Sequence, residues 1–131
     1  MSIQYLQEKH QSKVFKKYFA FFAFNKKQLD EQINSNFDYV ALGSGLCVPK
    51  PFAHKIMNKL GEIHKAAIAE HQRTTSKKDI IWDALANYEA QITGSITDAW
   101  ESLSDYPGIT KQDVLDQYGP YYTMCVEHDY F

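Results

Sequence analysis

The spacing of apolar residues at the start of the chain predicts a helix followed by a strand. Apolar residues recur at helical spacing over residues 3–18, and lysines gather on another face of the same segment. The aromatic run Tyr18–Phe24 that follows is apolar at successive positions, which is typical of a strand. Since a strand that is apolar on both faces is normally covered on both sides, we expect residues 18–24 to be central in a sheet.

Helix start signals and a glycine turn mark the next elements. Asn25 is a favoured N-cap residue, and Gln28 lies where the partner of a capping box belongs, so a short helix is expected there. Residues 38–48 contain two β-rich runs around a Gly-Ser-Gly turn, which predicts a hairpin. Pro51 suits the first turn of a long helix over residues 51–73.

Capping residues predict three further helices in the second half of the chain. Ser76 opens a helix that continues through residue 88, and Ser95 opens a helix over residues 96–104. A capping box of Thr110 with Asp113 opens residues 111–118, and Gly119-Pro120 is expected to stop that helix. The tail 121–131 alternates apolar and polar residues, which leaves an added strand and a draped extension both open.

These elements predict an α+β fold, in which a small antiparallel sheet of about three strands packs with five to six helices. A chain of 131 residues is expected to be one domain, 1–131, with a core that needs no disulfide or metal. Cys47 and Cys125 lie far apart and fit no metal-binding spacing, which is typical of a reducing, intracellular setting. The longest apolar run, residues 19–24, is too short for a bilayer, so we expect no membrane contact.

Charge is divided unevenly along the chain. Residues 1–78 carry 13 Lys/Arg and 6 Asp/Glu, whereas residues 79–131 carry 1 basic residue and 10 acidic ones. Net charge affects partners and association rates rather than fold. The sequence therefore predicts a basic half, 1–78, and an acidic helical half, 79–131, that meet charged macromolecules.

Catalytic motifs are not evident in the sequence. His64 and His71 lie seven residues apart on the predicted long helix, a spacing that favours ordinary histidines over a metal pair. A strand rather than a helix follows the Gly-Ser-Gly turn, so a turn is favoured over a phosphate-binding loop. We expect no catalytic residue, metal or cofactor, and an enzyme that uses Glu89 or His64 is the alternative with least support.

Three sequence blocks follow one another in the chain: Tyr18–Asn25, then Val40–Gly45 with Val48–Lys50, then Ala84–Glu89 with Thr93–Ala99. In this order they resemble a family of small uncharacterised phage proteins. The resemblance covers roughly residues 13–118, and the chain has Tyr88 where that family has His and Ser95 where it has Asp. It implies a phage-linked context in Bacteroidetes-type hosts, and it implies no mechanism.

Acidic residues form the first candidate binding surface. On the predicted 96–104 helix they lie opposite the apolar positions, and the next helix repeats the pattern. Such a face can simply be solvated, or it can dock onto a basic, nucleic-acid-binding groove with tyrosines as anchors. The candidate residues are Asp98, Glu101, Asp105, Asp113 and Asp116, with Tyr106, Tyr121 and Tyr122 expected to be exposed beside them.

Lysines form the second candidate surface, on one face of the first predicted helix. These residues are Lys9, Lys13, Lys16 and Lys17. A solvated face is the usual fate of such lysines. The functional interpretation is contact with a nucleic-acid backbone, which is independent of sequence and sensitive to salt.

Two hypotheses of function follow from these surfaces and from the resemblance, which implies the phage context and, through its hosts, the type VI candidate. In the first, the chain is a non-enzymatic phage inhibitor in the cytoplasm of a bacterial host, and it blocks a host defence protein by protein–protein contact. A basic RNA-guided CRISPR nuclease, with the RNA-targeting type VI enzymes as one candidate, is the expected partner, and the lysine face could also contact its guide RNA. In the alternative, the chain binds nucleic acid or a signalling nucleotide through the lysine-rich face.

Overall fold

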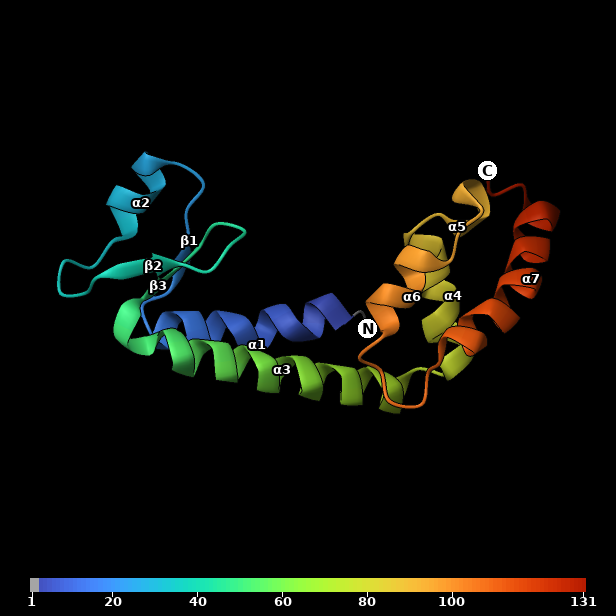
Figure 1. The fold of residues 1–131 in the computed structure, drawn as a ribbon, viewed down its shortest axis with the longest axis horizontal. Helices are drawn as coiled ribbons and strands as arrows, with labels where there is room; N and C mark the ends of the chain where they lie inside the picture. The colour runs from blue at the N-terminus through green and yellow to red at the C-terminus, as the bar shows by residue number, and fades with distance from the viewer. Residues whose placement is uncertain (1–2) are drawn as a thin grey trace. The chain divides into compact units, whose positions relative to one another are not determined.

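The computed structural model describes residues 3–131 and confirms the α+β fold. Across this range it contains seven α-helices and one antiparallel sheet of three strands (Figure 1). The chain forms two compact units, an N-terminal unit that ends at His71 and a C-terminal unit, Gln72–Phe131. The expected single domain of residues 1–131 stays a prediction.

Two long helices form the base of the N-terminal unit. Helix α1, Ile3–Lys17, lies beside α3, Ala53–Thr74, and the two run in opposite directions (Figure 1). A hydrogen bond between Gln7 Nε2 and His64 Nδ1 joins them. A short 3₁₀ turn, Lys50–Phe52, leads into α3, as expected from the proline at its first turn.

The three strands of the sheet are β1, Phe21–Phe22; β2, Tyr39–Ala41; and β3, Leu46–Pro49. Their order is β1-β3-β2, with Phe21 opposite Cys47 and Val40 opposite Val48. The expectation of a central strand over residues 18–24 is therefore wrong, because β3 is central and β1 is a short edge strand. The physical reason is local: Phe19 has a φ of 60°, so the extended backbone begins only after it.

Local chemistry explains the turn and the short helix of this unit. Gly43, Ser44 and Gly45 all have positive φ angles in the β2–β3 turn, where glycine avoids a steric cost. Helix α2, Lys26–Gln32, begins as predicted: Asn25 Oδ1 accepts a hydrogen bond of 2.8 Å from the Gln28 backbone N–H. The predicted hairpin and helix cap are both confirmed.

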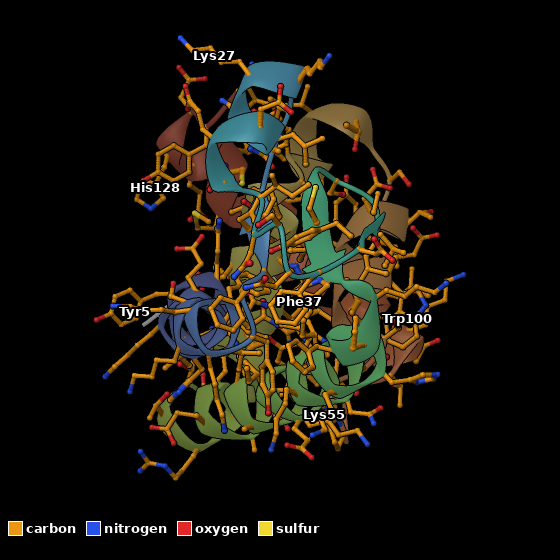
Figure 2. All side chains as sticks on the ribbon, turned by 90° about the vertical axis from the view of Figure 1, so that its left-hand side faces the viewer. Tyr5, Lys27, Phe37, Lys55, Trp100 and His128 are labelled. Carbon is orange, nitrogen blue, oxygen red and sulfur yellow. The ribbon has the colours of Figure 1, made fainter. Side chains whose placement is uncertain are left out.

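Aromatic rings surround the core of the N-terminal unit. Buried Leu46, Val48 and Ile56 form its centre. The Phe37 ring lies between those of Phe19 and Phe52, with centroids 5.4 Å and 5.3 Å away. Tyr5 and Lys27, by contrast, point outward (Figure 2). Contacts between aromatic rings therefore help to join this small sheet to the helices.

Four helices form the C-terminal unit. They are α4, Lys77–Asn87; α5, Ala90–Thr93; α6, Thr97–Leu103; and α7, Lys111–His128. Helix α4 contacts each of the other three, and it buries Ile80, Ile81, Ala84 and Leu85 (Figure 1). The predicted Ser76 cap and the Thr110–Asp113 capping box are confirmed. Ser95 Oγ does accept from the Thr97 N–H, but Ile96 holds the N-cap position of α6.

Helix α7 continues through Gly119-Pro120 to His128, so the predicted stop and the strand-like or draped tail are both wrong. Pro120 has no N–H, which leaves the carbonyl of Asp116 without its helical donor. Both residues are exposed, so water can hydrogen-bond that carbonyl. Burial of Tyr121 and Cys125 on the other face holds the helix together beyond the proline.

Candidate interaction surfaces

The acidic residues of α6 lie where the sequence predicted them. Asp98 and Glu101 are exposed, on the side of the helix opposite buried Ala99 and Leu103. Asp105 follows the helix and is also exposed. These three carboxylates give the outer side of α6 a negative charge.

The two acidic residues of α7 have different roles. Asp116 is exposed, and its Oδ1 accepts a hydrogen bond of 2.8 Å from Gln112. Asp113 instead lies 2.7 Å from Lys77 Nζ and closes the capping box with Thr110. The Lys77 contact, followed by the Thr110 backbone N–H, lowers the pKa of Asp113 below its usual value. Asp113 is therefore engaged within the unit, whereas Asp116 faces outward.

Two of the three tyrosines expected as anchors are buried, so their predicted exposure is wrong. Tyr106 is 5% exposed and Tyr121 is 3% exposed, whereas Tyr122 is 41% exposed as expected. Tyr121 is buried because α7 continues past Pro120, which brings this residue onto the same face as Val114. Its hydroxyl donates a hydrogen bond of 2.7 Å to Gln91 Oε1. Burial raises the pKa of Tyr106 to about 12 and also raises that of Tyr121.

Helix α7 also carries an exposed apolar stripe. We define the α7 stripe as Leu115, Tyr122 and Val126, which are 46%, 41% and 55% exposed. Helical spacing places them on one side of α7, and the Phe131 ring lies 5.8 Å from that of Tyr122. The helix predicted over residues 111–118 ends before Tyr122, so the sequence did not reveal this stripe. The signal that could have found the stripe is the helical spacing of these residues, read across Gly119-Pro120.

Charge in the C-terminal unit is strongly negative. Residues 72–131 contain ten acidic residues and four basic ones. One of the four, Lys77, pairs with Asp113, and another, Lys78, places its Nζ 4.6 Å from the Trp82 ring centroid. The acidic residues of α6 and α7 therefore lie on a unit whose net charge is negative.

The predicted lysine face belongs to the N-terminal unit. Lys9, Lys13, Lys16 and Lys17 are all exposed on α1. Lys17 Nζ lies 5.3 Å from the Tyr18 ring centroid, which is within the range of a cation–π contact. The two predicted surfaces therefore belong to different units of the chain.

The N-terminal unit also contains a groove, which the sequence did not predict. It has a volume of about 460 Å³ and lies among α1, β1 and the segment that joins α2 to β2. Its walls include Phe19, Phe21 and Tyr39, and Lys16 of the lysine face also lines it. No sequence motif marks this groove, because its residues come from three separate segments.

Within residues 3–131, no three His, Cys, Asp or Glu side chains are grouped in a way that could hold a metal ion. The helices of this same range also include none with the length and apolar character needed to cross a membrane. Cys47 and Cys125 are both free thiols.

Comparison with known proteins identifies a family for this chain. No curated protein and no solved structure is similar enough to match it. A family model does match, and it covers residues 2–120. The chain therefore belongs to DUF7659, a family of unknown function.

Proposed function

We propose that this chain is a binding protein whose C-terminal unit docks onto a basic surface of a partner protein. The observation that carries the proposal is the exposed α7 stripe on a unit with ten acidic and four basic residues. At 100° per residue, Asp116 and Glu127 lie along one edge of the stripe. Apolar anchors with a charged border are the usual composition of a specific interface.

The apolar residues of the α7 stripe and the acidic residues contribute to binding in different ways. Burial of Leu115, Tyr122 and Val126 against the partner supplies affinity, since a few buried side chains dominate most interfaces. Asp98, Glu101 and Asp116 supply orientation and a fast, salt-sensitive encounter with a positive surface. The buried Tyr106 and Tyr121 support the fold and do not contact the partner.

The partner that we propose is a host defence protein, with the RNA-guided type VI CRISPR nucleases as the candidate. The chain would then be a phage inhibitor that acts in the cytoplasm of a bacterial host. Support comes from the resemblance of three sequence blocks to small phage proteins. Further support is that a nuclease which holds guide RNA needs the kind of basic surface that an acidic face complements.

A matched pull-down tests this proposal. The bait is the full chain, the lysate comes from a Bacteroidetes host that carries a type VI system, and the comparison bait is Asp98→Lys with Glu101→Lys. We expect the wild type to retain the nuclease and the charge-reversed variant to lose it. Lys9→Glu with Lys13→Glu is the matched control on the other unit. Retention of no defence protein, or equal retention by all three baits, would contradict the proposal.

The lysine face supports a second candidate, contact with nucleic acid. Four exposed lysines on one side of α1 can neutralise backbone phosphates without reading bases. RNA binding by the full chain would then weaken steeply with salt, and Lys9→Glu with Lys13→Glu would abolish it. Failure to retain RNA or DNA at low salt would rule out this candidate.

A further inference from the structure

We propose that the groove of the N-terminal unit binds one nucleotide unit, with its base against the aromatic walls and its phosphate at Lys16. This inference does not depend on the acidic face. The volume of about 460 Å³ lies within the range of pockets that hold small molecules. The ligand is a base that carries a phosphate, either as a free mononucleotide or as one unit of a single strand.

Aromatic rings form the walls on which the base would lie. Phe21 and Tyr39 pack against one another, with ring centroids 5.2 Å apart. Phe19 lines the groove as well, and although its ring rests against Phe37 it remains 49% exposed. An aromatic ring that is fixed by a neighbour yet open to solvent is a suitable platform for base stacking.

Phe19 follows the end of α1, where the Ala20 N–H donates to the Phe15 carbonyl at 2.9 Å and closes the helix. Its φ of 60° is left-handed, a conformation that is strained for a bulky residue. The Tyr39 hydroxyl holds this strained residue in place, because it donates to the Phe19 carbonyl at 3.2 Å and accepts from the Asn34 N–H at 3.3 Å. The helix end and the Tyr39 hydroxyl together fix the position of the Phe19 backbone at the groove.

Two amide side chains offer hydrogen bonds to the edge of a base. Gln32 Nε2 donates to the Phe22 and Gln28 carbonyls, and Asn34 Oδ1 accepts from the Asn36 N–H. These bonds leave the Gln32 oxygen as an acceptor and the Asn34 nitrogen as a donor, and both residues line the groove. A base edge presents a donor beside an acceptor, which is why Asn and Gln are common partners of bases.

Charge in the groove favours an anionic ligand. Among the described residues that line the groove, Lys16 is the only charged one, and no acidic residue lines it there. Lys16 also belongs to the lysine face, so the groove opens beside exposed Lys13 and Lys17 on the same helix. A phosphate attached to a base in the groove would therefore meet positive charge.

Chemical-shift mapping on the full chain tests the proposal. The probes are AMP, GMP, CMP and UMP, the four nucleosides without phosphate, inorganic phosphate alone, and short single-stranded RNA. We expect at least one mononucleotide to bind saturably and to shift the resonances of Phe19, Gln32, Asn34 and Tyr39. A preference for RNA over the mononucleotide would identify a strand as the source of the ligand, and equal affinity would identify the free nucleotide.

Three variants and one control separate the parts of the site. Phe19→Gly removes the stacking ring and relieves the left-handed backbone, and we expect nucleotide affinity to fall about tenfold or more. Lys16→Ala leaves the walls intact, so mononucleotide affinity should fall about threefold to tenfold while nucleoside affinity stays unchanged. Lys27→Ala, exposed on α2 and outside both the groove and the lysine face, should change neither. Lys9→Ala, on the lysine face but outside the groove, should lower mononucleotide affinity less than Lys16→Ala does.

Three outcomes would overturn this inference. The first is the absence of shifts at the groove with any nucleotide or RNA at millimolar concentration. The second is binding of inorganic phosphate as tight as that of the nucleotides, which would mean an anion contact without a base site. The third is equal loss of affinity in Lys9→Ala and Lys16→Ala, which would place the phosphate on the lysine face at large.

Discussion

Lys77 Nζ lies 2.7 Å from Asp113 Oδ2, and this ion pair joins the start of α4 to the first turn of α7. The same carboxylate oxygen accepts a hydrogen bond of 2.8 Å from the Thr110 N–H. Asp113, which the sequence placed on the binding face, therefore fixes the start of the helix that carries the α7 stripe.

The first prediction concerns acid stability. The folded state lowers the pKa of Asp113, so its contribution is complete above the unfolded value of about 3.9 and is lost as the pH falls through the folded pKa. Asp113→Asn should therefore lower the urea midpoint at pH 7 and have little effect near pH 2. Asp98→Asn, on the exposed side of α6, is the control and should leave the midpoint unchanged. An equal deficit of Asp113→Asn at both pH values would contradict this role.

The second prediction concerns the proline inside α7. Pro120 removes a helical hydrogen bond at an exposed position, so Pro120→Ala should raise the free energy of unfolding by about 1–3 kcal/mol. Gly119→Ala is a useful companion, since a Cβ there meets nothing within 4 Å and should add about 0.5–1 kcal/mol. Urea denaturation measures both changes. A loss of stability in Pro120→Ala would show that the fold depends on the proline.

Local signals predicted much of the fold. Asn25 with Gln28, Ser76 with Asp79, and Thr110 with Asp113 each mark a helix start by bonds within one turn, and all three are present. Such bonds are set by neighbouring residues, so they can be inferred without the tertiary fold.

Features set by contacts between distant residues were mispredicted. The predicted stop at Pro120 rests on the rule that proline ends a helix. Burial of Tyr121 and Cys125 overrides that rule in α7. That error also placed Tyr121 outside and hid the α7 stripe. The groove could not be predicted at all, because Lys16, Phe19 and Tyr39 meet only in the folded unit.

The third prediction concerns the buried phenols. Burial raises the pKa of Tyr106 to about 12, above the unfolded value of about 10, so stability should fall as the pH rises through 10. Ultraviolet difference titration should show late-titrating tyrosines, and Tyr106→Phe should remove part of that late component. Unchanged titration in Tyr106→Phe would contradict the burial of this side chain.

The fourth prediction separates the α7 stripe from the core. Leu115→Ser with Val126→Ser alters exposed side chains, so the free energy of unfolding should change by less than about 0.5 kcal/mol per site. Partner retention in the pull-down should nevertheless be lost. Val114→Ser is the contrasting variant, since Val114 is fully buried and its replacement should lower stability. Retention of the partner by the stripe variant would remove the stripe from the interface.

The most direct test of the central claim is cleavage of a reporter RNA by a purified type VI nuclease with its guide RNA. Wild-type chain at stoichiometric excess should block cleavage, and Lys9→Glu with Lys13→Glu should block it equally well. Asp98→Lys with Glu101→Lys should restore cleavage, because the two lysines that replace carboxylates on the outer side of α6 would repel the basic partner. Cleavage that continues with the wild type, or that is blocked equally by the Asp98→Lys/Glu101→Lys variant, would contradict the account.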